Sequence, residues 1–91
     1  MRFEKDRIEE FLNNFDRIKE RIRKHPGCRL LELYQDREDP RVFFTYSYWD
    51  SQEYLEKYRD SELFREVWKE TRAMFSDRPK AWSVDKIVSL P

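Results

Sequence analysis

The first part of the chain carries apolar side chains at helical spacing. Between Asp6 and Arg23 these side chains form one stripe, and charged residues fill most of the other positions. Such spacing is typical of an amphipathic helix that packs on a core through one face. His25-Pro26-Gly27 is expected to end the helix, because Pro and Gly favour helix C-termini. The stripe consists of Ile8, Phe11, Leu12, Phe15, Ile18 and Ile22.

The middle of the chain has the pattern of two strands. Cys28–Gln35 and Arg41–Trp49 are bounded by polar segments, and the second is dominated by β-branched and aromatic residues. The short turn Asp36–Pro40 between them predicts an antiparallel hairpin. The carboxylates of this turn are interpreted as solvated charges: Asp36, Glu38 and Asp39.

A second helical region follows the hairpin. Asp50 and Glu53 have the spacing of a capping box, so a helix is expected to begin there. Asp60-Ser61 offers a second cap, which predicts an interruption. A new apolar stripe then runs from Leu63 to Phe75 and stops at Ser76–Pro79.

The end of the chain alternates between apolar and polar residues. Trp82, Val84 and Val88 share one face of this alternation, which predicts a final strand over Ala81–Leu90. If Met1–Phe3 ends a first strand, the order βαββαβ is that of a ferredoxin-like α+β protomer. Residues 1–91 then form one domain, in which helices cover one face of an antiparallel sheet.

The second strand is aromatic on both faces. Val42, Phe44, Tyr46 and Tyr48 alternate with Phe43, Thr45, Ser47 and Trp49. Helices cover only one face of such a sheet, and the other is expected to be polar if it meets water. We therefore predict a homodimer through the open sheet face. A monomer with exposed tyrosines is the alternative, because their hydroxyl ends tolerate water.

Composition narrows the class of protein. The 19 basic and 19 acidic residues balance, which disfavours a nucleic-acid binder and an acidic-membrane binder. One cysteine, Cys28, forbids an internal disulfide and fits a reducing compartment. No apolar run approaches a membrane span, and the N-terminus has no signal-peptide pattern. We expect a cytoplasmic protein.

Several segments together resemble the antibiotic biosynthesis monooxygenase family. The stretch from Phe43 to Phe64 is the most specific part, and the likeness runs from about Phe3 to Val88. The segments are Pro26-Gly27-Cys28, Leu31-Glu32-Leu33, Phe43–Ser51, Tyr58–Phe64, Val67-Trp68 and Pro79–Val84. The family's opening strand is longer than Met1–Phe3 and central in the sheet. Here the strand is either very short or continues upstream of Met1.

The resemblance implies a dimeric α+β barrel, in which two ferredoxin-like protomers pack sheet against sheet. Some members oxidise phenols or hydroquinones with dioxygen and use no metal, flavin or haem, so no cofactor is expected. Haem-degrading relatives carry a histidine iron ligand where this chain has Trp68, and their site tryptophan falls at Tyr58. Indole offers iron no lone pair, so haem degradation is not expected.

Five residues are candidates for a substrate pocket. The resemblance assigns Trp49 to the end of the middle strand, where an indole could stack on a planar substrate. Tyr58 and Trp68 lie on helix faces expected to look onto the sheet, and the Tyr58 hydroxyl is also a catalytic candidate, as a donor to a substrate oxygen. Thr45 and Ser47 leave room beside larger residues. Each also has an ordinary explanation, namely aromatic packing for the rings and β-propensity or surface exposure for the hydroxyls.

The remaining candidates are two titratable groups. Lys19 projects near the apolar stripe, where an ammonium could stabilise a substrate anion, although a snorkelling lysine explains it equally. His25 is the only histidine, and its corner position predicts a surface residue. One His and one Cys do not supply a familiar zinc or non-haem iron site, so no metal is expected.

Three functions are weighed against one another. The first is a cofactor-independent monooxygenase acting on a small phenol, quinol or polyketide-like aromatic. The second is a non-oxidative small-molecule binding protein or isomerase on the same dimeric barrel. An RNA-binding module of similar topology is disfavoured, because the middle strand has no glycine among its aromatics and the net charge is zero.

Overall fold

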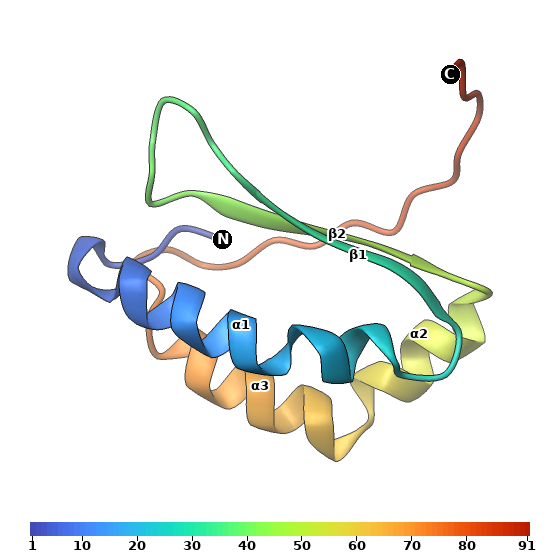
Figure 1. Cartoon of the computed structure of the whole chain (residues 1–91), viewed down its shortest axis with the longest axis horizontal. Helices are drawn as coiled ribbons and strands as arrows, with labels where there is room; N and C mark the ends of the chain where they lie inside the picture. The colour runs from blue at the N-terminus through green and yellow to red at the C-terminus, as the bar shows by residue number, and fades with distance from the viewer.

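The computed structural model describes residues 1–91. Helix α1 (Ile8–Arg23) leads into a hairpin of β1 (Cys28–Gln35) and β2 (Phe43–Trp49), followed by α2 (Gln52–Arg59) and α3 (Glu62–Arg72). The two strands are antiparallel, and the helices lie on one side of them (Figure 1). This is the predicted α+β protomer, with its sheet covered on one face.

The core is mostly aromatic and lies between α1, the hairpin and the segment after α3. Phe3, Phe11, Phe43 and Met74 are its buried members. The rings of Phe3 and Phe11 stack with centroids 4.1 Å apart, and Phe43 meets both edge-on. Burial of several large rings compensates for the small size of the domain, since each removes a large apolar surface from water.

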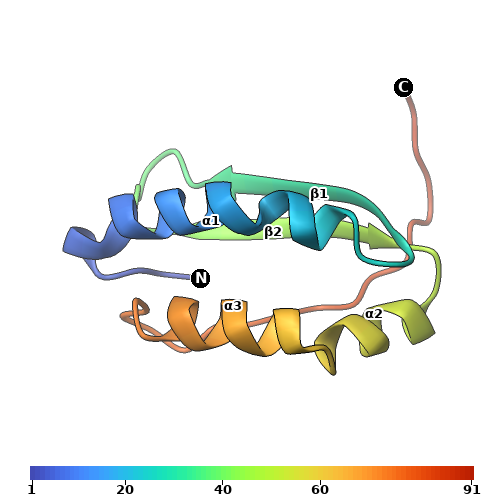
Figure 2. The ribbon, with the colours of Figure 1, turned by 60° about the horizontal axis from the view of Figure 1, so that its bottom comes forward.

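Arg2 and Phe3 make isolated β-bridges where the sequence predicted the end of a first strand. Arg2 forms a bridge to Val42, and Phe3 forms a bridge to Phe75. The Met1 ammonium donates to the Phe43 carbonyl at 2.8 Å, and the Phe43 N–H donates to the Met1 carbonyl at 2.8 Å. The N-terminus thus lies beside β2, between the hairpin and α3 in the view of Figure 2.

The predicted final strand over Ala81–Leu90 is wrong for this protomer. Residues 78–91 have no regular secondary structure, and residues 81–91 are all exposed. The bridge from Phe75 to Phe3 is the last β-pairing along the chain. The residues after it pair with no strand, although their alternation favours one.

Helices α2 and α3 each begin at a serine that caps the helix N-terminus. The Ser51 side chain accepts from the Tyr54 N–H, so Ser51 caps α2 in place of the predicted Asp50. Asp50 instead binds Arg29, at 2.7 Å and 2.9 Å. The predicted interruption at Ser61 is confirmed, because its hydroxyl accepts from Phe64 and starts α3.

Gly27 is required at the corner between α1 and β1. Its φ is +86°, and a Cβ at this position would overlap the ring of Tyr54. We expect Gly27→Ala to lower the free energy of unfolding by about 1–3 kcal/mol, because it adds backbone strain and a clash. Urea unfolding followed by circular dichroism measures this. A Gly27→Ala protein as stable as the wild type would contradict the assignment.

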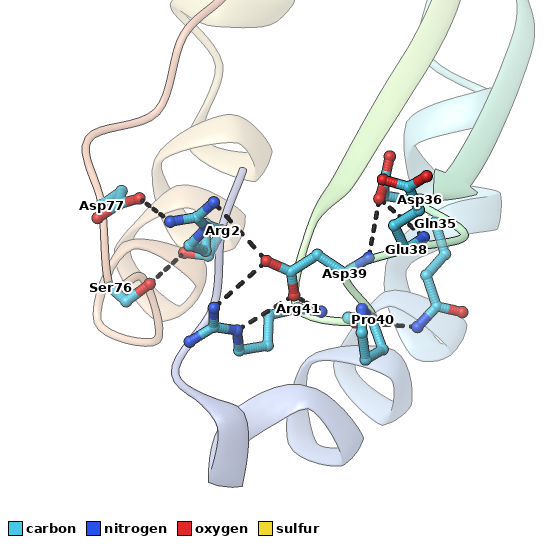
Figure 3. Close-up of polar contacts among 9 residues, drawn as sticks. All are labelled: Arg2, Gln35, Asp36, Glu38, Asp39, Pro40, Arg41, Ser76 and Asp77. Carbon is cyan, nitrogen blue, oxygen red and sulfur yellow. Dashed lines mark hydrogen bonds and ion pairs between the residues drawn. The ribbon is translucent and has the colours of Figure 1, made fainter.

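Ion pairs hold the N-terminus against the hairpin turn. Asp39 binds Arg41 at 3.1 Å and Arg2 at 3.6 Å, and Arg2 also binds Asp77 at 3.1 Å (Figure 3). Asp36 accepts from the N–H groups of the turn at 2.8 Å and 3.0 Å. The carboxylates of Asp36 and Asp39 thus have structural contacts in the turn, with Asp39 shared between two arginines.

This network predicts a pH dependence. The hydrogen bond from Arg41 holds the pKa of Asp39 below its usual range, with smaller support from Arg2. A lowered folded pKa stabilises the fold above the unfolded pKa, and that stabilisation is lost as pH falls through the folded pKa. We expect Asp39→Asn to reduce stability at neutral pH and the difference from wild type to vanish in acid. Thermal unfolding of both proteins across pH tests this, and a constant difference would contradict it.

Candidate functional site

One end of the molecule brings three chain segments together. The corner after α1, the end of β2 and helix α2 meet there (Figure 1). The rings of Trp49 and Tyr58 stack with centroids 5.0 Å apart and an interplanar angle of 22°. His25 meets both rings edge-on, at 5.2 Å from Tyr58 and 6.2 Å from Trp49. We call His25, Trp49 and Tyr58 the aromatic cluster.

The indole of Trp49 is oriented by its neighbour on the same face of β2. Its Nε1–H donates to the Ser47 hydroxyl at 2.9 Å. Side chains two residues apart on a strand point the same way, which makes this bond possible. Three of the five predicted pocket residues, Ser47, Trp49 and Tyr58, therefore lie together.

Tyr58 is the most buried member of the cluster, with 8% of its surface exposed. Its hydroxyl makes no hydrogen bond within the protein. Burial, with a smaller contribution from the Cys28 thiol, raises the pKa of Tyr58 to about 12. The hydroxyl is thus protonated at neutral pH and free to donate to a bound oxygen atom.

His25 is not the surface residue that its corner position predicted. It is half-buried against Trp49 and Tyr58, and its Nδ1 is buried without a hydrogen-bond partner. The corner folds inward because Gly27 turns the chain onto α2. This is a tertiary arrangement, and a single histidine before a proline in the sequence does not predict it. A buried imidazole nitrogen without a partner is a polar group that a ligand could satisfy.

The edge of β2 beside the cluster is open. Phe43 exchanges both of its backbone hydrogen bonds with Met1. The backbone N–H and C=O groups of successive residues alternate between the two edges of a strand. The backbone groups of Thr45 and Ser47 therefore point to the same edge as those of Phe43, the edge away from β1, where no further strand pairs with them. Thr45 is exposed although it shares a face with buried Phe43. The structure therefore leaves Thr45 and Ser47 accessible beside the aromatic cluster.

The last two candidates lie elsewhere. Trp68 does not touch Trp49 but is linked to Tyr58 through Phe64, with centroid distances of 5.2 Å and 5.8 Å. Lys19 lies on the exposed surface of α1, where its ammonium binds Asp16 at 2.5 Å. This hydrogen bond raises the pKa of Lys19 above its usual value. No hydrogen bond or ion pair joins Lys19 to another candidate.

Cys28 and two surface hollows complete the description. Burial raises the pKa of the Cys28 thiol, which keeps it protonated. One hollow of about 350 Å³ lies between α1 and α3, and Trp68 lines another of about 340 Å³.

No three His, Cys, Asp or Glu side chains are grouped to hold a metal ion. None of the helices is long and apolar enough to cross a membrane.

The chain belongs to the antibiotic biosynthesis monooxygenase family. The model of that family matches residues 1–70, which include β2 and the aromatic cluster. The resemblance inferred from the sequence is thereby confirmed. No curated protein matches the chain.

Solved structures agree with the fold. A crystal structure described as an antibiotic biosynthesis monooxygenase is 20% identical and has a TM-score of 0.87, covering 94% of this chain and 90% of that one. A conserved protein from Methanosarcina mazei is 21% identical with a TM-score of 0.80, covering 85% and 76%. A protein from Pseudomonas aeruginosa is 21% identical with a TM-score of 0.73, covering 85% and 78%. At these identities the likeness establishes the fold alone.

Proposed function

We propose that the protein is a cofactor-independent monooxygenase acting on a small phenol, quinol or polyketide-like aromatic. The observation that carries the proposal is the aromatic cluster, in which Tyr58 presents an unpaired hydroxyl within a nearly buried site. Trp49 supplies a flat apolar surface for an aromatic ring. Family membership makes oxygenation the first chemistry to test.

The proposed reaction draws its electrons from the substrate. A substrate phenolate transfers one electron to dioxygen, and the phenoxyl radical and superoxide then combine to form a carbon–oxygen bond. The resulting hydroperoxide loses water, so one oxygen atom enters a quinone product and the other leaves as water. The protein's contribution is orientation and electrostatic stabilisation.

Each residue of the site has a proposed role. The Tyr58 hydroxyl donates to the substrate oxygen and favours its anion, a task that its raised pKa permits at neutral pH. Ser47 holds the indole of Trp49 in place. We assign anion stabilisation to Tyr58 and not to Lys19, because Asp16 already binds the Lys19 ammonium.

Dioxygen uptake with a panel of phenols and quinols tests the proposal. Turnover that consumes dioxygen supports it. We expect Tyr58→Phe to lower kcat/KM about 10- to 100-fold, since a hydrogen bond to a developing charge is lost while the ring stays. Thr71→Ser, a change elsewhere in the helix layer, is the matched control and should keep full activity. Equal activity of Tyr58→Phe and wild type would remove Tyr58 from the mechanism.

The alternative is a non-oxidative binding protein or isomerase on the same scaffold. The unpartnered Nδ1 of His25 favours it, because a buried imidazole can move a proton without dioxygen. Turnover that continues under anaerobic conditions, or tight binding without turnover, would select this alternative. A cytoplasmic location and the absence of a cofactor stay predictions. Native mass spectrometry of the purified protein tests whether a cofactor is bound.

We also propose a homodimer through the open sheet face. Phe44, Tyr46 and Tyr48 are 40–50% exposed on the side of β2 away from the helices. Leu30 and Tyr34 lie across from Tyr48 and Phe44 in the register. Glu32 lies between Leu30 and Tyr34 on this face and accepts a hydrogen bond from the Tyr34 hydroxyl. An exposed face with this many large apolar side chains is typical of an interface. Five more large apolar side chains are exposed in the C-terminal segment: Trp82, Val84, Ile87, Val88 and Leu90.

A further inference from the structure

A hollow on α2 and α3 gathers positive charge around two aromatic rings. It has a volume of about 340 Å³, and no acidic residue lines it. The rings of Phe64 and Trp68 stack there, with centroids 5.8 Å apart and an interplanar angle of 17°. The other lining residues are all cationic: Arg59, Arg65, Lys69 and Arg72. We call these six residues the cationic hollow.

None of the four cations belongs to an ion pair. Eight ion pairs form elsewhere in a chain whose acidic and basic residues are equal in number. The only side-chain hydrogen bond among the four runs from Arg65 to the backbone carbonyl of Asp60, at 3.1 Å. Glu66, one residue along α3, binds Arg21 on α1 instead. The charge in the hollow is therefore uncompensated.

Local electrostatics accounts for only part of this arrangement. The helix dipoles favour Arg59 in the last turn of α2 and Lys69 and Arg72 in the last turn of α3, but not Arg65 near the start of α3. Arg65, Lys69 and Arg72 also follow one another at helical spacing on α3, where neighbouring like charges repel. Charged side chains that repel one another and have no acidic partner within the protein are typical of functional surfaces.

We propose that the cationic hollow binds a small aromatic carboxylate. Guanidinium groups bind carboxylates with two parallel hydrogen bonds, and the exposed edges of Phe64 and Trp68 offer an apolar surface to the ring. The residues that line the hollow belong to α2 and α3. These helices lie on the covered side of the hairpin (Figure 1), so a dimer through the open sheet face leaves the hollow free. The proposal does not depend on the oxygenase chemistry.

Calorimetric titration with naphthoate tests the proposal on the whole protein. Naphthalenemethanol, which has the same ring without the charge, is the matched ligand. We expect naphthoate to bind at least about tenfold more tightly than the alcohol, and more weakly as the salt concentration rises. The double variant Arg65→Gln/Arg72→Gln should lose at least about tenfold in naphthoate affinity.

The control is Arg37→Gln/Arg78→Gln, which removes the same charge from exposed residues outside the hollow and should bind like the wild type. Circular dichroism verifies that both variants fold. Three results would overturn the proposal: no binding of naphthoate, equal binding of the two ligands, or equal loss in the two double variants. A loss of naphthoate binding in Trp49→Ala but not in Arg65→Gln/Arg72→Gln would also overturn it, because the ligand would then occupy the aromatic cluster.

Discussion

Trp49→Ala is expected to weaken the binding of a phenol such as naphthol by about 10- to 100-fold while the protein stays folded and dimeric. The indole stacks on Tyr58 and is held by Ser47, so its removal takes away both the ring surface and the orientation of the site. The stacking contribution and the lost apolar contact predict an affinity loss of about 10- to 100-fold. Calorimetry measures the affinity, and native mass spectrometry measures the oligomer.

Two further variants distinguish a role of the Trp49 indole in ligand binding from a role in packing. Trp49→Phe keeps an aromatic ring and should retain part of the affinity. Ser47→Ala removes the hydrogen-bond partner of Nε1 and leaves the ring, so it should weaken binding less than Trp49→Ala. If Trp49→Ala unfolds the protein or dissociates the dimer, Trp49 is a structural residue and its assignment to the site is wrong.

The second large effect is expected at the open sheet face. Phe44→Asp should convert a dimer into monomers, because Phe44 is half exposed on the face proposed to meet the partner. An unpaired carboxylate at a buried interface is strongly unfavourable, and symmetry places two of them in each dimer. We expect the dissociation constant to rise by about a hundredfold or more, as for hot-spot residues. Analytical ultracentrifugation across a dilution series measures it.

Leu12→Asp is the matched control for this experiment. Leu12 is an apolar residue with 41% of its surface exposed, and it lies on α1 in the helix layer. The same change from an apolar to an acidic side chain should leave the oligomer intact there. A wild-type protein that is monomeric at micromolar concentration, or equal dissociation in both variants, would refute the interface.

The helices were predictable because local pattern and tertiary packing favour the same structure. Most of the apolar stripe of Ile8–Arg23 faces the core, where Phe11 and Ile22 are buried, whereas its member Leu12 is exposed. The break at Ser61 was also predictable, since a hydroxyl that accepts from the chain three residues ahead is a local interaction. The two faces of β2 separated as expected, with Phe43 buried and Phe44 exposed.

The final strand shows where local pattern is insufficient. Residues 81–90 alternate as a strand does, but a strand also needs a neighbour whose backbone groups it can bind. Such a neighbour comes from parts of the chain far apart in the sequence, and the only pairing of the segment after α3 is the bridge of Phe75 with Phe3. His25 was mispredicted for a similar reason, because its burial depends on how Gly27 turns the chain toward α2.

The sequence by itself determined the helices, the hairpin, the family and the residue types of the site, because periodicity, turns and caps involve neighbours along the chain. Only the tertiary structure decided which candidates meet. It joined Ser47, Trp49 and Tyr58, added His25, and separated Lys19 and Trp68 from them. It also left four cations of α2 and α3 without acidic partners. The physical reason is that the contacts of Tyr58 with Trp49 and His25 depend on how α2 packs on the hairpin and the corner after α1, which no short stretch of sequence encodes.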